Sequence, residues 1–187
     1  MKVWSSFKSL LQAYILSLEK LPIAMIDDFK RYLEHMPIKS DVSLSVLKGH
    51  LLIEELIWSL IRSKVVSSSE LEKTRFSFEQ LTYLARALSG DSGDSWVWDS
   101  VKKLNRIRNL LAHRLEPKNL NVKLSELYIS IQKGLSEEKE ISSIALVGEL
   151  HWYLGALYLS LSARLHVKPK TLLGMSPEEL AKIVLNE

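Results

Sequence analysis

Residues 96–117 carry the side chains best suited to chemistry, in the sequence WVWDSVKKLNRIRNLLAHRLEP. Arg108 is followed directly by Asn109, and His113 stands five positions after Arg108. A histidine titrates near pH 6.5 and can take or give a proton. An arginine is permanently charged and donates forked hydrogen bonds to phosphate oxygens. The three residues therefore predict proton transfer next to a bound phosphate, with Asn109 orienting the phosphate or the imidazole.

The same segment is basic and has the period of a helix. Residues 96–118 carry a formal charge of +4, more than the +3 of the whole chain. At about 100° per residue, its apolar positions form one buried stripe and its polar positions form another face. The polar face holds Lys102, Asn105, Arg106, Asn109 and His113. We expect Lys102, Arg106 and Asn105 to contact a substrate backbone, although such cations are also common on a purely solvated face. Arg108 falls at the margin of the apolar stripe, so its guanidinium must emerge beside a neighbouring helix or another subunit.

The arginine, asparagine and histidine of RNLLAH resemble the Arg-x4-His motif of the HEPN superfamily. The sequence LKGHLLIEELIWSLI, residues 47–61, is similar to the long helix that precedes this motif in several such proteins. The resemblance covers roughly residues 40–135. It implies a helical bundle, often dimeric, in which two motifs face each other. In active members it also implies metal-independent RNA cleavage that leaves a cyclic phosphate.

The resemblance has one departure and one geometric condition. Toxins of this group that pair with nucleotidyltransferase antitoxins often carry a tyrosine two residues after the histidine, where this chain has Leu115. Control by modification of that tyrosine is therefore not expected. On one helix, Arg108 and His113 are about 7.5 Å and about 140° apart. They can act together only if the helix ends before His113 or if two subunits meet.

Three alternatives follow from these residues. The first is a HEPN-like endoribonuclease, a homodimeric toxin or phage-defence effector of a prokaryote, with catalytic Arg108 and His113 and supporting Asn109. The second is a catalytically inactive HEPN-like module that binds RNA or a partner protein such as an antitoxin. The third is an unrelated helical regulator or scaffold, in which Arg108 pairs with Glu54, Glu55 or Glu79 and His113 interacts with the helix dipole.

The elements that must position the motif read as six or seven helices in an antiparallel bundle, an all-α fold. Proline boundaries predict helices over 3–20 and 23–35, and a cap at residue 40 or 41 begins a long helix to about residue 66. Further helices are expected after a break and cap at residues 67–69, with Glu70 and Glu72 in the first turn, over 78–88 with an end at Gly90, and from Trp96 to His113 or Leu115. Others are expected over 120–133 with an end at Gly134, from Ser136 to His166, and after Ser176. We expect a single domain over 1–187, with 1–37 a possible appendage, 40–135 the HEPN-like core and 136–187 the C-terminal helices.

Composition excludes several other functions. The 187 residues include no cysteine, so disulfides, cysteine-ligated metals and thiol nucleophiles are impossible. No glycine-rich phosphate loop or other cofactor motif is present. His50, Glu54 and Glu55 have a metal-compatible spacing but lack a third ligand, so neither a metal nor a cofactor is expected. The most apolar segment has only fourteen consecutive residues free of charge, 150–163, too few for a membrane span. We therefore expect a cytoplasmic protein.

Overall fold

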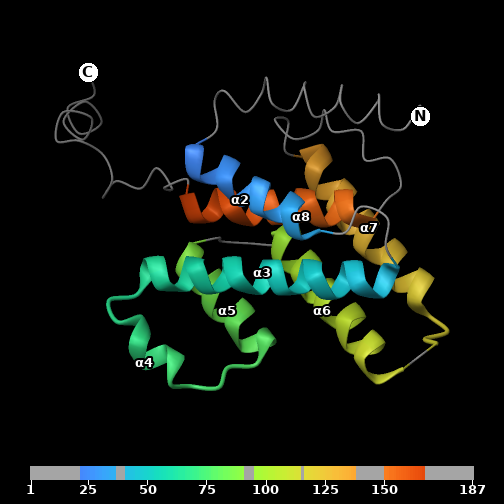
Figure 1. Cartoon of the computed structure of the whole chain (residues 1–187), viewed down its shortest axis with the longest axis horizontal. Helices are drawn as coiled ribbons and strands as arrows, with labels where there is room; N and C mark the ends of the chain where they lie inside the picture. The colour runs from blue at the N-terminus through green and yellow to red at the C-terminus, as the bar shows by residue number, and fades with distance from the viewer. Residues whose placement is uncertain (1–21, 37–40, 91–94, 115, 138–149, 167–187) are drawn as a thin grey trace.

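The computed structural model describes residues 22–36, 41–90, 95–114, 116–137 and 150–166, and these ranges fold into helices without a strand (Figure 1). The seven helices are α2 (Ile23–His35), α3 (Val42–Lys64), α4 (Ser68–Glu72), α5 (Phe78–Ser89), α6 (Trp96–His113), α7 (Leu120–Glu137) and α8 (Leu150–His166). The prediction of an all-α bundle is confirmed. The helices expected over 3–20 and after Ser176 lie outside the described residues.

Helix α3 runs through the middle of the bundle, with α2 and α8 on one side and α5 and α6 on the other (Figure 1). Helix α7 packs along α6, and α2 packs along α8. The core between them is dominated by large aliphatic side chains and by one indole. Its fully buried members include Ile53, Ile57, Trp98, Leu104, Leu127 and Leu154. This core holds α3 and α6 in a fixed register, which positions the motif residues.

Local sequence signals account for several helix ends. Pro22 precedes α2, and the Asp41 side chain accepts from the Ser43 backbone N–H at the start of α3. Ser77 and Gln80 form a reciprocal capping box at the start of α5. Gly90 ends α5 at φ 74°, a left-handed conformation that glycine adopts without steric cost.

The predicted boundary near Gly134 is wrong. Helix α7 continues through Gly134 to Glu137, so Ser136 belongs to α7 and does not begin the next helix. Gly134 is buried, and a Cβ placed there would collide with the Trp96 ring. The glycine therefore permits close packing of α6 on α7 instead of ending a helix. The last long helix is described over Leu150–His166, and the residues on either side of it lie outside the described ranges, so its predicted beginning at Ser136 is wrong and its predicted end stays a prediction.

None of the helices in the described ranges is long and apolar enough to cross a membrane.

Candidate functional site

Arg108 lies half-buried on α6 and emerges beside α3. Its Nη1 donates to Oδ1 of Asn109 at 3.1 Å. Burial is the largest cause of the pKa shifts of His50 and Glu54 on α3, and the positive charge of Arg108 acts to lower both pKa values, so the guanidinium lies within electrostatic reach of these two side chains. Among the described residues no carboxylate forms an ion pair with it within 4 Å. The predicted pairing with Glu54, Glu55 or Glu79 is therefore absent there, and the guanidinium is not neutralised by direct contact.

His50 is a buried histidine on the inner side of α3, with 4% of its surface exposed. Its Nε2 lies 3.2 Å from Oδ1 of Asn105, and its ring packs on Phe78 with centroids 4.1 Å apart. Burial lowers the pKa of His50 to about 4, while the contact with Asn105 opposes this shift and the charge of Arg108 adds to it. The ring is therefore neutral at pH 7, and we assign the Nε2–H as the donor to Asn105.

Glu54 lies one turn after His50 on α3. Its Oε2 is 3.7 Å from Nδ1 of His50, beyond hydrogen-bonding distance. Burial raises the pKa of Glu54, and the charge of Arg108 lowers it. The charge of Arg108 therefore acts on Glu54, although no ion pair joins the two side chains within the described ranges.

The two asparagines of the motif helix use their oxygens internally. Oδ1 of Asn105 accepts from His50, and Oδ1 of Asn109 accepts from Arg108. Each amide N–H2 group consequently points away from that internal donor. Arg108 and Asn109 stand three and four residues after Asn105, so each lies about one turn from Asn105 and the three residues border one side of α6. The face offers hydrogen-bond donors and one fixed positive charge, an arrangement that suits an anion such as a phosphodiester.

His113 is the last residue of α6 and is exposed. The helix does not end before it, so one of the two conditions for joining His113 to Arg108 is removed. A single chain leaves the two side chains on different sides of α6. His113 follows Asn109 by four residues and lies on that side of the helix, so it is the pairing of His113 with Arg108 that requires a second subunit.

The expected backbone-binding cations differ in their surroundings. The ammonium of Lys102 lies 4.7 Å from the centroid of the Tyr83 ring, and the side chain is half-buried. Arg106 is exposed and has no hydrogen-bonding or charged partner within the described ranges. The neighbouring lysine, Lys103, is already engaged. Its ammonium forms an ion pair with Asp99 on the same helix and lies 3.5 Å from the Ser130 hydroxyl on α7. Arg106 is thus the more available of the two predicted contacts.

His50 is the site residue that sequence reasoning missed in this role. Its sequence spacing indicates only a possible metal ligand, whereas in the structure it orients Asn105. Among the described residues, no cluster of three or more histidine or acidic side chains could hold a metal ion. The available signal was a histidine within an otherwise apolar stretch of α3, which required either a metal or a buried polar partner.

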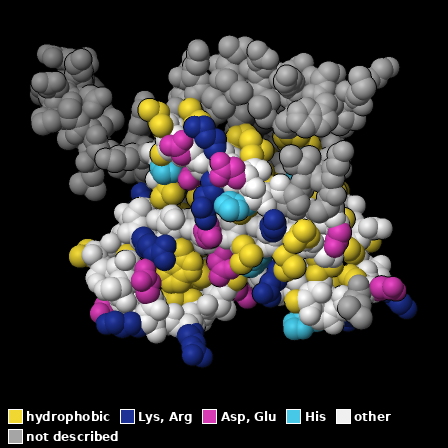
Figure 2. Space-filling model, in the orientation of Figure 1, with side chains coloured by type: hydrophobic (Ala, Val, Ile, Leu, Met, Phe, Trp, Pro, Cys, Tyr) yellow, Lys and Arg dark blue, Asp and Glu magenta, His cyan; other side chains and the backbone are white. Residues whose placement is uncertain are grey.

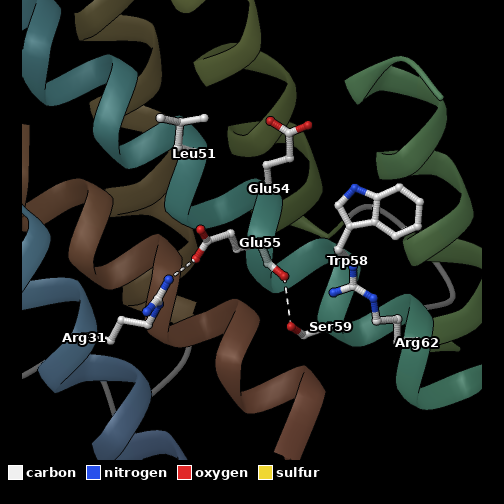
Figure 3. A pocket seen from close by; sticks show the side chains of 7 residues that line it. All are labelled: Arg31, Leu51, Glu54, Glu55, Trp58, Ser59 and Arg62. Carbon is white, nitrogen blue, oxygen red and sulfur yellow. Dashed lines mark hydrogen bonds and ion pairs between the residues drawn. The ribbon is translucent and has the colours of Figure 1, made fainter. Parts of the chain in front are cut away.

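A shallow pocket of about 470 Å³ lies on the solvent side of α3 (Figure 3). Its lining includes Glu54 but none of the donor-face residues on α6. Nη2 of Arg31 binds Oε2 of Glu55 at 2.6 Å, and the Arg62 guanidinium lies 5.5 Å from the Trp58 ring centroid. Arg62 also binds Glu72 at 2.9 Å. Both arginines of the pocket are therefore paired with acids.

Comparisons with family models, with curated proteins and with solved structures gave no match.

Proposed function

We propose that this chain is a HEPN-like, metal-independent endoribonuclease that acts as a homodimeric toxin or phage-defence effector. The observation that carries the proposal is the donor face of Asn105, Arg108 and Asn109, in which both amide oxygens are occupied by internal donors. The face fits the non-bridging oxygens of a phosphodiester. Lys102 and Arg106 extend its positive charge along α6. A cognate antitoxin is a further partner that the resemblance implies.

The chemistry follows from these groups. The 2′-oxygen of RNA attacks the adjacent phosphorus, and the bond from phosphorus to the 5′-oxygen breaks. One His113 accepts the 2′-OH proton, and the His113 of the second copy donates a proton to the leaving 5′-oxygen. Arg108 stabilises the charge that develops on the phosphorane, supported by Asn109. The products are a 2′,3′-cyclic phosphate and a 5′-hydroxyl.

The test is RNA cleavage in EDTA by the wild type and by Arg108→Ala and His113→Ala variants. Two matched controls are available in the chain. His35 is an exposed histidine that ends α2 as His113 ends α6, and Arg75 is an exposed arginine between α4 and α5. Cleavage should fall at least about 100-fold in both variants, because His113→Ala removes a proton-transfer group and Arg108→Ala removes the cation that stabilises the phosphorane. His35→Ala and Arg75→Ala should cleave like the wild type.

Two outcomes would overturn the proposal: a wild type that is inert on total RNA, or Arg108 and His113 variants that cleave normally. The separation of these two residues on one unbroken helix favours the second candidate, a catalytically inactive HEPN-like module. That module would bind RNA or a partner protein through the same donor face. Filter binding of RNA by the inert wild type, weakened by Arg108→Ala, would support it.

A further inference from the structure

Three leucines of α3 form an exposed stripe, defined here as Leu44, Leu47 and Leu51. They are 42%, 39% and 58% exposed. Their spacing of three and four residues places them on one side of the helix, and Trp58 continues it one heptad after Leu51. Figure 2 shows hydrophobic side chains among charged ones on the α3 side of the molecule. The other sides of α3 are packed against α8, α5 and α6.

An apolar stripe with this spacing is the pattern of paired helices. Repeats of three and four residues keep a seam facing a second helix over several turns. Isolated exposed leucines are ordinary on protein surfaces, whereas a contiguous row marks an interaction surface. The leucine stripe therefore calls for an occupant with a matching helical face.

We propose that a second copy of this chain covers the leucine stripe, with the two α3 helices antiparallel about a two-fold axis near Leu51. A two-fold interface uses the same patch on both copies. With the axis there, Leu51 meets its own equivalent, and Leu44 of one copy lies opposite Trp58 of the other. The stripe is thus complementary to itself.

The charges beside the stripe support this occupant. Lys48 precedes Leu51 by three residues and Glu55 follows it by four. In the antiparallel arrangement these two positions flank the seam on the same side, so Lys48 of each copy lies beside Glu55 of the other. Lys48 has no ion-pair partner within the described ranges. Glu55 binds Arg31 at 2.6 Å and remains exposed enough to accept a second cation.

The interface also bears on the donor face. Glu54 lies in the stripe's own spacing, three residues after Leu51, and it shares the field of Arg108. Pairing through α3 would therefore bring the two Arg108 side chains toward one interface. The inference deepens the proposed function, which calls for two copies of the motif, but its test does not depend on RNA cleavage.

Cross-linking tests the position of the axis. The chain has no cysteine, so one introduced cysteine is unique. Leu51→Cys should form a covalent dimer with a short bismaleimide, because the axis places residue 51 opposite itself. Ile129→Cys is the matched control, since Ile129 is an exposed apolar residue on α7. Equal cross-linking at the two positions, or none at residue 51, would overturn the proposal.

Sedimentation equilibrium of the full chain tests the contacts. Leu51→Glu should raise the dimer dissociation constant at least about 100-fold, since the buried leucine is lost from both copies. Ile129→Glu should leave it unchanged. Lys48→Glu should weaken the dimer, and the added change Glu55→Lys should restore it. A monomeric wild type, a dimer insensitive to Leu51→Glu, or a charge exchange without rescue would each contradict the interface. A dimer that fails only to cleave RNA would remove the proposed function and leave the interface standing.

Discussion

Nε2 of His50 lies 3.2 Å from Oδ1 of Asn105, and this contact joins the buried side of α3 to the face of α6 that carries Arg108. A neutral, buried histidine is a permanent donor at pH 7. The asparagine amide is consequently held with its oxygen toward His50 and its N–H2 group away from it. Orientation of the donor face is thus built into the packing of two helices.

Asn105→Asp should weaken RNA binding by about tenfold or more. The change keeps an acceptor for His50 but removes the amide donors and adds a negative charge one turn from Arg108. Fluorescence anisotropy with labelled RNA in the His113→Ala background measures binding without cleavage. Asn121→Asp, at an exposed position on α7, adds the same charge and should have a much smaller effect. Equal affinities for the two variants would remove Asn105 from the site.

His50→Gln should reduce the loss of unfolding free energy that occurs when the pH falls from 7 to 5. The folded pKa of His50 is about 4 and its unfolded pKa about 6.5, so the unfolded chain binds the proton first as the pH falls. Between pH 7 and pH 5 the wild type should lose about 2 kcal/mol of unfolding free energy through this residue. Glu54, whose pKa is raised, acts with the opposite sign in both proteins. Urea denaturation at the two pH values checks the difference, and an equal loss in both proteins would contradict it.

Two buried serines of α8 should respond to alanine with opposite signs. The Ser160 hydroxyl is buried and has no hydrogen-bond partner within the described ranges, so Ser160→Ala should stabilise the fold by about 1 kcal/mol. The Ser162 hydroxyl donates to Oδ2 of Asp28 at 2.5 Å, so Ser162→Ala should cost about 1.5–3 kcal/mol. Thermal unfolding of the pair is the measurement. A lower melting temperature for Ser160→Ala, or a higher one for Ser162→Ala, would contradict this difference in hydrogen bonding.

Gly134→Ala should destabilise the protein although alanine favours helices by about 1 kcal/mol. The added methyl group would collide with the Trp96 ring, and repacking of this kind costs about 1–3 kcal/mol. Lys133→Ala, one residue earlier on an exposed part of the same helix, isolates the effect of helix propensity. Denaturant midpoints should fall for Gly134→Ala and stay near wild type for Lys133→Ala. A higher midpoint for Gly134→Ala would mean that the ring moves aside freely.

Local signals in the sequence were sufficient for much of the fold. The predicted bounds of α2 agree with the structure because Pro22 and Pro37 restrict the backbone at both ends. The end of α5 was predicted because glycine is favoured where helices end, and the structure shows Gly90 in the left-handed conformation of such ends. Gly134 was misread for the opposite reason. Its role depends on Trp96, thirty-eight residues earlier, and no local rule reports that contact.

The candidate site could be predicted only along α6. Helical spacing grouped Asn105 with Asn109 and placed Arg108 at the margin of the buried stripe. The partner of Asn105 comes from α3, and its identity depends on the register in which two helices pack. That register follows from the whole core, so His50 could be recognised only as a buried polar side chain in need of a partner.

Asp28 on α2 accepts from Ser162 and from His166, whose Nε2 lies 2.9 Å away, across 134 and 138 positions of the chain. Synthesis proceeds from the N-terminus, so α2 and α3 leave the ribosome long before α8 exists to cover them. The buried side of Tyr32 and the inner face of α3 are then open to chaperones or to other nascent chains. During synthesis, the contacts between α2 and α8 can therefore form only after residues 150–166 have left the ribosome.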